Sequence, residues 1–223
     1  METRELIVLS KLSGMSCFPY RKDPSKGSML EQLLLQYPTQ YQDWPDGFEG
    51  GIAHRLDVAT SGQLLVAKTP NILLALRSDF AQKRLRKHYR FLTKKSVSWQ
   101  QHEISFPIAH HKNNRRKMVV QRGRNTPHRG KWMSAVTKFQ YLKSKDGMHL
   151  WQASMYTGVM HQIRLHAAIA GLALVGDTLY GGGETPTYFP SDFALHHCGI
   201  ESTRWGAPMI PTPTWWPEWT HKC

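Results

Sequence analysis

The segment from His54 to Lys68 constrains this chain more than any other. Two glycines precede it, and glycine permits backbone angles that other residues avoid. Arg55 and Asp57 stand two residues apart, a Thr-Ser-Gly turn signal follows, and the apolar run Leu64–Ala67 predicts a buried strand. A charged pair beside a core strand is either a structural ion pair or a reactive site on a rigid support. Taken alone, the segment favours the structural pair, because such pairs outnumber catalytic ones.

The charge balance predicts a polyanionic partner. The 223 residues contain 29 Lys and Arg against 16 Asp and Glu, which gives a formal net charge of +13. Such an excess favours nucleic acid. A membrane surface would attract the same charge, but the sequence contains no stretch long and apolar enough to span a bilayer and no long basic amphipathic helix. We therefore expect RNA, and no membrane, as the partner.

The amino-terminal residues and the cysteines predict a cytoplasmic protein with free thiols. Residues 1–10 carry acidic side chains where a secretory signal would be basic. Cys17, Cys198 and Cys223 lack the CxxC spacing of a zinc ribbon, and their odd number argues against a disulfide framework. The histidine pairs at 110–111 and 196–197 lack a second spaced pair of ligands, so we expect no metal site.

Periodic patterns predict a mixture of strands and helices. Strands are predicted at 5–9, 64–67, 89–93, 135–142, 148–156, 172–175 and 193–200, and helices after Ser28, after Thr69 and over 160–170. The second helix is expected to bury Leu73, Leu74, Leu76 and Phe80. Asp146-Gly147 predicts a hairpin turn. We expect one α+β domain over residues 1–223, with a mainly antiparallel mixed sheet flanked by helices and loops and no separate amino-terminal RNA-binding domain.

Several segments, taken together and in order, resemble the RluA-type RNA pseudouridine synthases (RluA-, RluC- and RluD-like). They are Ile7–Gly14, His54-Arg-Leu-Asp57 with Thr60-Ser-Gly62 and Ala67-Lys68, Lys87-His-Tyr89, Pro107-Ile108, Arg116–Val120, Thr157–His166, Gly176–Gly181 and Leu195-His-His197. Each piece is a weak pattern, but the collinear set covers nearly the whole chain. The chain departs from the family pattern at Leu12, Val58-Ala59, Gln63 and Val159-Met160.

The resemblance implies an isomerase that converts a uridine of rRNA or tRNA to pseudouridine, with no cofactor and no metal. The uracil is cut from C1′, turned, and rejoined through C5. By resemblance Asp57 is the catalytic carboxylate and Arg164 the cation that keeps it ionised. Tyr89 would lie against the uracil or assist proton removal from C5, although its strand pattern alone predicts a core residue. Whether Asp57 attacks C1′ or removes the 2′ hydrogen stays open.

The resemblance also implies a set of RNA-binding residues. Arg55 would enter the space that a flipped base leaves, with an ordinary phosphate contact as the alternative. His161 and Leu165 accompany Arg164 at the start of the predicted helix and are assigned to substrate binding. Arg116 and Lys117 belong to a basic hairpin, where phosphate contacts would make the affinity for RNA fall steeply with salt. The protein is expected to act as a monomer.

Two other functions remain open on the sequence. A non-catalytic RNA-binding protein that retains the synthase scaffold is motivated by Val159-Met160, which replace an Arg-Thr pair of the family pattern. A nucleoside or glycoside hydrolase that uses Asp57 would want a second carboxylate, and the matched motifs offer no obvious partner acid.

Overall fold

The computed structural model describes residues 1–19, 27–45, 49–187 and 193–221. Cys223 and its predicted free thiol lie outside these residues. The strands are β1 (Leu6–Lys11), β2 (Ser61–Ala67), β3 (Arg86–Thr93), β4 (Gln101–Ile104), β5 (Ile108–His111), β6 (Met118–Val120), β7 (His128–Met133), β8 (Thr137–Lys145), β9 (Met148–Met155) and β10 (Leu195–Glu201). The α-helices are α1 (Met29–Gln36), α2 (Pro70–Ala81) and α3 (Gln162–Ile169). No helix of these described ranges has the length and apolar character that crossing a bilayer requires.

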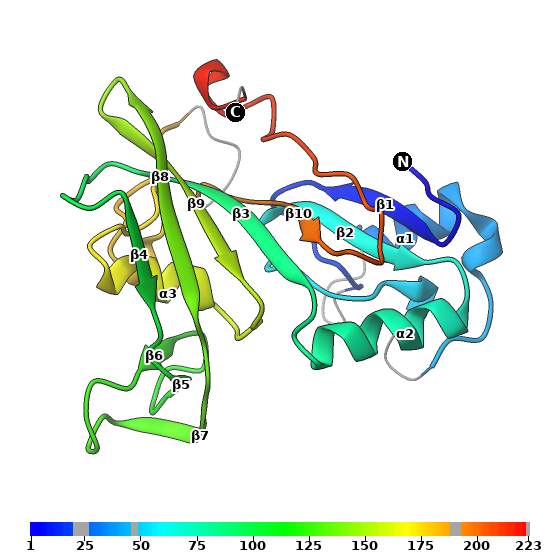
Figure 1. The fold of residues 1–223 in the computed structure, drawn as a ribbon, viewed down its shortest axis with the longest axis horizontal. Coiled ribbons are helices and arrows are strands. Elements are labelled where there is room, and N and C mark those ends of the chain that lie inside the picture. Colours follow the sequence, from blue (N-terminus) through cyan, green and yellow to red (C-terminus); the bar gives the residue numbers. More distant parts are fainter. Residues whose placement is uncertain (20–26, 46–48, 188–192, 222–223) are drawn as a thin grey trace.

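One long, twisted sheet organises the described residues (Figure 1). Its strand order is β1-β2-β10-β3-β9-β8-β4, and β5, β6 and β7 form a second sheet of three strands at one end of the molecule. Every neighbouring pair of the long sheet is antiparallel except β2 and β10, which run parallel. The predicted α+β architecture with a mainly antiparallel mixed sheet is what the structure contains.

Helices cover both faces of the sheet at β1 and β2. Alternate residues of the two strands pack towards α1, among them Leu64 and Val66 with Leu30 and Leu33. The intervening residues pack towards α2 in a second cluster, Leu6, Val8, Leu65, Ala67, Leu73 and Leu76. All seven residues of β2 are therefore buried. This double burial explains why Leu64–Ala67 of β2 form a continuous apolar run and not an alternating one.

Local capping signals fix where the helices begin. Ser28 accepts from the backbone N–H of Glu31 while the Glu31 carboxylate accepts from the Ser28 backbone, so the predicted capping box is present. Thr69 caps α2, with proline at its first position. The hairpin turn predicted at Asp146-Gly147 is also confirmed: both residues have positive φ, 52° and 73°, between β8 and β9.

Three local predictions differ from the structure. Residues 172–175 form no strand, because the chain turns at Gly171 and Gly176 and only Leu174 makes a bridge to the sheet. Leu74 is 51% exposed, since it lies on the outer face of α2. The strand predicted from 89 begins at Arg86, so Lys87 belongs to the sheet.

Gly62→Ala is expected to destabilise the protein by about 3 kcal/mol or more. Gly62 has φ +128°, and a β-carbon there would lie 2.2 Å from the carbonyl oxygen of His197, its parallel neighbour on β10. Urea denaturation measures the loss. Gly123→Ala is the matched control, because Gly123 has open space around it and needs no positive φ; a change beyond about 0.5 kcal/mol there would contradict the steric explanation.

Candidate active site

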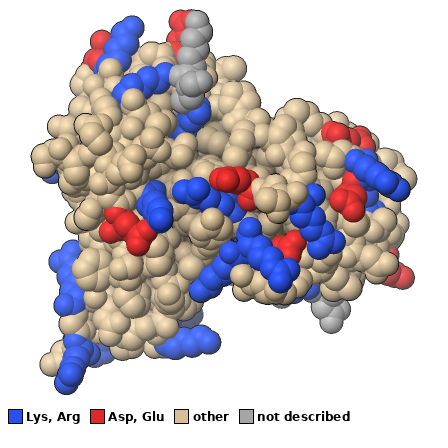
Figure 2. Space-filling view, viewed as in Figure 1, with Lys and Arg blue, Asp and Glu red and all other residues tan. Residues whose placement is uncertain are grey.

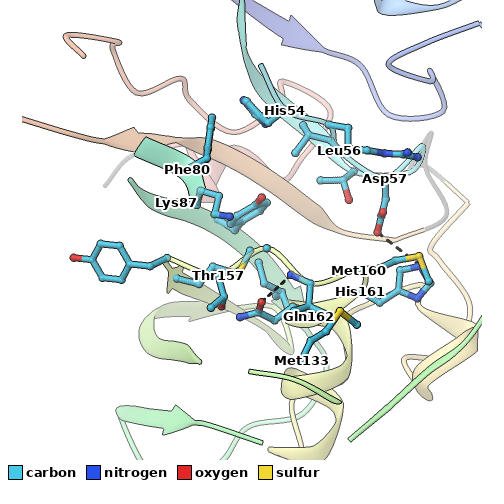
Figure 3. Close-up of a pocket in the computed structure, with 18 of the residues that line it drawn as sticks. His54, Leu56, Asp57, Phe80, Lys87, Met133, Thr157, Met160, His161 and Gln162 are labelled. Carbon is cyan, nitrogen blue, oxygen red and sulfur yellow. Dashed lines mark hydrogen bonds and ion pairs between the residues drawn. The ribbon is translucent and has the colours of Figure 1, made fainter. Parts of the chain in front are cut away.

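A cavity of about 930 Å³ opens between α2, β3 and the loop that leads into α3 (Figure 3). Segments far apart in the sequence line it: residues 53–57 before β2, the end of α2, Lys87 and Tyr89 of β3, and residues 155–164. The polar side chains in its wall include Arg55, Asp57, Arg77, Lys83, Lys87, Tyr89, His161 and Arg164. A cavity of this size with converging charged groups is the usual form of a substrate site.

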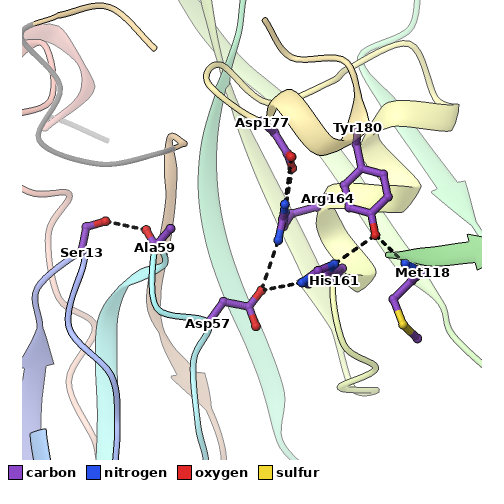
Figure 4. Close-up of polar contacts among 8 residues, drawn as sticks. All are labelled: Ser13, Asp57, Ala59, Met118, His161, Arg164, Asp177 and Tyr180. Atoms are coloured by element: carbon purple, nitrogen blue, oxygen red, sulfur yellow. Dashed lines mark hydrogen bonds and ion pairs between the residues drawn. The ribbon is translucent and has the colours of Figure 1, made fainter. Parts of the chain in front are cut away.

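The loop that carries Asp57 is tied down by its backbone (Figure 4). The Thr60 N–H donates to the Asp57 carbonyl at 3.0 Å and closes a turn. The buried Lys11 ammonium donates to the Val58 carbonyl at 2.9 Å, and the Ser13 hydroxyl donates to the Ala59 carbonyl at 2.6 Å. The Asp57 carboxylate takes no part in these bonds, so it is free to face the cavity on a fixed support.

Arg164 is held mainly by Asp177 and only secondarily faces Asp57. Its Nε and Nη2 donate to the two Asp177 oxygens at 2.7 and 2.9 Å, and both side chains are buried. Its third nitrogen, Nη1, lies 3.8 Å from Asp57 Oδ2. The bidentate pair fixes the guanidinium plane, and the guanidinium carbon also lies 4.3 Å from the centre of the Phe193 ring. One fixed cation thus faces Asp57.

The imidazole ring of His161 faces the same carboxylate. The Tyr180 hydroxyl accepts from the Met118 backbone N–H at 2.9 Å and shares a hydrogen bond with His161 Nδ1 at 3.0 Å, which holds the imidazole ring in place (Figure 4). Burial and then the Arg164 charge lower the pKa of His161, although Asp57 opposes them. The other ring nitrogen, Nε2, lies 3.9 Å from Asp57 Oδ2.

Tyr89 lies deep in the cavity. It is 7% exposed and stacks at 4.5 Å, centroid to centroid, on the neutral ring of His197. Burial, and after it the Asp57 charge, raises the pKa of the Tyr89 phenol above its usual range. The phenol is therefore protonated in the free protein, and Tyr89 offers the cavity an aromatic surface and a hydroxyl group rather than a tyrosinate.

Residues 5–169 match the protein family described as RNA pseudouridylate synthase. This match covers more than half of the 223 residues. The chain belongs to the RNA pseudouridylate synthase family.

Individual relatives agree with this assignment. Ribosomal large subunit pseudouridine synthase D of Zymomonas mobilis is 31% identical over 180 residues, which cover 81% of this chain and 54% of the relative. The protein of the same name from Nitrosomonas europaea is 32% identical over 181 residues, which cover 81% of this chain and 48% of the relative. This chain thus spans about half the length of the relatives that it matches.

Two solved human structures share the fold of this family member. RNA pseudouridylate synthase domain containing 1 superposes with a TM-score of 0.69 at 22% identity, covering 96% of this chain and 78% of the other. RNA pseudouridylate synthase domain containing 4 superposes with a TM-score of 0.71 at 19% identity, and the match covers 96% of this chain and 88% of the other. The family and the fold class predicted from the sequence are both confirmed.

In this synthase-family chain, the residues assigned to the site from the sequence fall into two groups. Arg55, Asp57, Tyr89, His161 and Arg164 all line the cavity. Leu165, Arg116 and Lys117 do not.

The three residues outside the cavity have different surroundings. Leu165 points into a core cluster with Ile108, Met118, Val120 and Ala135, so the structure places its side chain away from the cavity. Arg116 is exposed on the turn between β5 and β6. Lys117 lies beside that turn with its ammonium 5.9 Å from the Tyr180 ring. Neighbouring residues of a helix point about 100° apart, which is why Leu165 packs in the core while Arg164 faces the cavity.

The sequence assigned no role to Asp177 or Tyr180, and it grouped Lys87 with Lys83, Arg84 and Arg86 as a basic cluster suited to phosphate. Asp177 and Tyr180 belong to the matched segment Gly176–Gly181, and Lys87 belongs to Lys87-His-Tyr89. The family patterns therefore included these residues but did not indicate which side chains they contact. The described residues contain no cluster of three His, Cys, Asp or Glu side chains able to hold a metal ion.

Proposed function

We propose that this protein is an RNA pseudouridine synthase with Asp57 as the catalytic carboxylate. The carrying observation is that Asp57, on a backbone-fixed turn, faces both Arg164 and His161 across the cavity at 3.8 and 3.9 Å. Asp177 holds the Arg164 guanidinium and Tyr180 holds the His161 ring, so both groups keep a fixed position beside the carboxylate. An ionised carboxylate at a cavity mouth can attack C1′ of a ribose or take its 2′ hydrogen.

The remaining cavity residues fit the same reaction. Tyr89 offers a flat surface for the uracil once it is detached and a hydroxyl group near C5. Arg55 is exposed beside Asp57 and suits the role of filling the stack after the base has flipped out. The isomerisation needs no external electrons or groups, so these side chains suffice for it without a cofactor.

Basic side chains around the cavity support RNA as the substrate. Figure 2 shows Lys and Arg gathered where α2 ends and β3 begins, and again towards the end of the molecule formed by β5, β6 and β7. We propose a uridine of rRNA or tRNA as the target, with the protein acting as a monomer in the cytoplasm.

Arg116→Met is expected to weaken RNA binding and to lower the slope of log Kd against log salt by about 1, because one phosphate contact is lost. Fluorescence anisotropy with a labelled RNA at several salt concentrations measures the slope. Lys138→Met serves as the matched control: Lys138 is an exposed cation of β8 whose ammonium already pairs with Glu103 at 3.4 Å. Equal slopes for wild type and Arg116→Met would remove this residue from the RNA surface.

Mapping of pseudouridine across all cellular RNA, in cells with and without the gene, tests the function. Loss of one or a few sites without the gene, restored by the wild-type gene, is the expected result. Unchanged maps would exclude the proposed activity in those cells and favour the alternative hypothesis, a non-catalytic RNA-binding protein that retains the synthase scaffold.

A further inference from the structure

Lys87 is a buried cation in the wall of the cavity without a counter-charge. It is 9% exposed, and the structure shows no hydrogen bond or ion pair for its ammonium among the described residues. The ammonium lies 5.9 Å from the centre of the Phe80 ring. Holding an ammonium out of water without a counter-charge is unfavourable. A cation kept in such a position indicates that a negatively charged or polar group of the bound ligand pairs with it.

The surroundings of Lys87 leave room for that partner. A β-carbon at Gly158 would lie 2.7 Å from Lys87 Nζ, so the glycine before α3 makes space for the ammonium. Tyr89 shares the sheet face of Lys87, and the other titratable groups near its ammonium among the described residues are the rings of His54 and His197. Burial lowers the pKa of both rings, so both are neutral. Burial likewise lowers the pKa of Lys87 to about 8, which leaves most of it protonated at neutral pH.

Position within the cavity decides which part of an RNA meets Lys87. Lys87 and Tyr89 are two residues apart on β3, so their side chains share one face of the sheet. Asp57, which would meet the sugar, has a side chain 37% exposed and lies nearer the solvent. A uridine whose C1′ is at Asp57 therefore extends its base inward to Tyr89 and Lys87. Its phosphates stay outside, near exposed cations such as Arg55 and Lys83.

We propose that Lys87 binds a carbonyl oxygen of the uracil ring and stabilises the negative charge that the ring acquires when it is detached. The inference rests on the proposed function. In either route for Asp57, the C1′–N1 bond breaks and its electron pair leaves with the uracil, where O2 and O4 share the charge. C5 then bonds to C1′ as Asp57 leaves C1′ in the first route or returns the 2′ hydrogen in the second, and the hydrogen lost from C5 is balanced by one gained at N1. Lys87 keeps its proton throughout and acts electrostatically.

Kinetics separate this role from phosphate binding. Lys87→Met is expected to lower kcat by about 10²- to 10³-fold. The Kd for RNA, measured in an Asp57→Asn background, and its salt slope should stay close to their values with Lys87 present. A phosphate contact would give the opposite pattern, a weaker Kd and a slope lower by about 1, and would overturn the proposal, as would an unchanged kcat. Lys138→Met is the matched control, with kcat as in wild type.

The melting temperature of the Lys87→Met variant separates a role in the reaction from a role in stabilising the fold. Methionine fills nearly the same volume without a charge, so Lys87→Met should melt no lower than wild type while losing activity. A clear drop in melting temperature would assign Lys87 to the scaffold and contradict the proposal.

Binding of an anionic uracil tests the proposal without turnover. The probe is 5-nitrouracil, which is an anion at neutral pH, with neutral uracil as the comparison. Wild type should prefer the anion and lose most of this preference as pH rises from about 7 to 9 and Lys87 loses its proton. Lys87→Met should show a weaker preference, due to the other cations of the cavity wall, that does not change between about pH 7 and pH 9. No preference in wild type overturns the proposal. A wild type that binds the anion through Lys87 but modifies no RNA would support the proposal and contradict the proposed function.

Discussion

Asp57→Asn is expected to abolish pseudouridine formation while leaving the fold and RNA binding in place. The amide has nearly the same shape as the carboxylate but no negative charge, so it can neither attack C1′ nor take the 2′ hydrogen. The turn that holds residue 57 is closed by backbone bonds and by Lys11 and Ser13, none of which uses the carboxylate. A loss of at least about 10⁴-fold in the single-turnover rate is expected for a group of this kind.

Mass spectrometry of nuclease-digested RNA measures the pseudouridine formed by each variant. Asp146→Asn is the matched control, because it makes the same carboxylate-to-amide exchange at a hairpin turn where asparagine tolerates the positive φ of 52° equally well. Its rate should equal that of wild type. An Asp57→Asn protein that forms pseudouridine at more than a few per cent of the wild-type rate would remove Asp57 from the chemistry.

Residues with strong local signals behaved as the sequence predicts. The capping box at Ser28, the turn at Asp146 and the buried run of β2 depend on neighbours within a few positions, so their patterns are readable without the fold. Asp57 and Tyr89 were found through a collinear family pattern, and the fold brings them to one cavity.

Roles set by long-range contacts were not readable in this way. Arg164 was paired with Asp57 from the sequence, yet its bidentate partner is Asp177, and only the packing of the 176–181 turn against α3 reveals this. Lys87 read as part of a basic cluster after α2, because its burial depends on the loop at Gly158 across the cavity. Charge runs look alike in sequence whether they face solvent or a cavity.

Asp177→Ala is expected to destabilise the protein by about 3–5 kcal/mol. Asp177 and Arg164 are 1% and 7% exposed, so removing the carboxylate leaves a buried guanidinium with its two best hydrogen bonds unmade. Urea denaturation at neutral pH measures the loss. Glu103→Ala is the exposed comparison: its ion pair with Lys138 is open to solvent, and a change below about 1 kcal/mol is expected.

The double variant Asp177→Ala/Arg164→Met distinguishes an unpaired charge from simple loss of packing. If the unpaired guanidinium causes the instability, adding Arg164→Met should restore much of the stability, because a buried ion pair replaced by apolar groups is often neutral. If packing is the cause, the two losses should add. Activity must stay low in the double variant in either case, since Asp57 then lacks the cation 3.8 Å away. Restored stability with low activity would show that the ion pair of Asp177 and Arg164 serves to orient Arg164 toward Asp57 and adds little net stability to the fold.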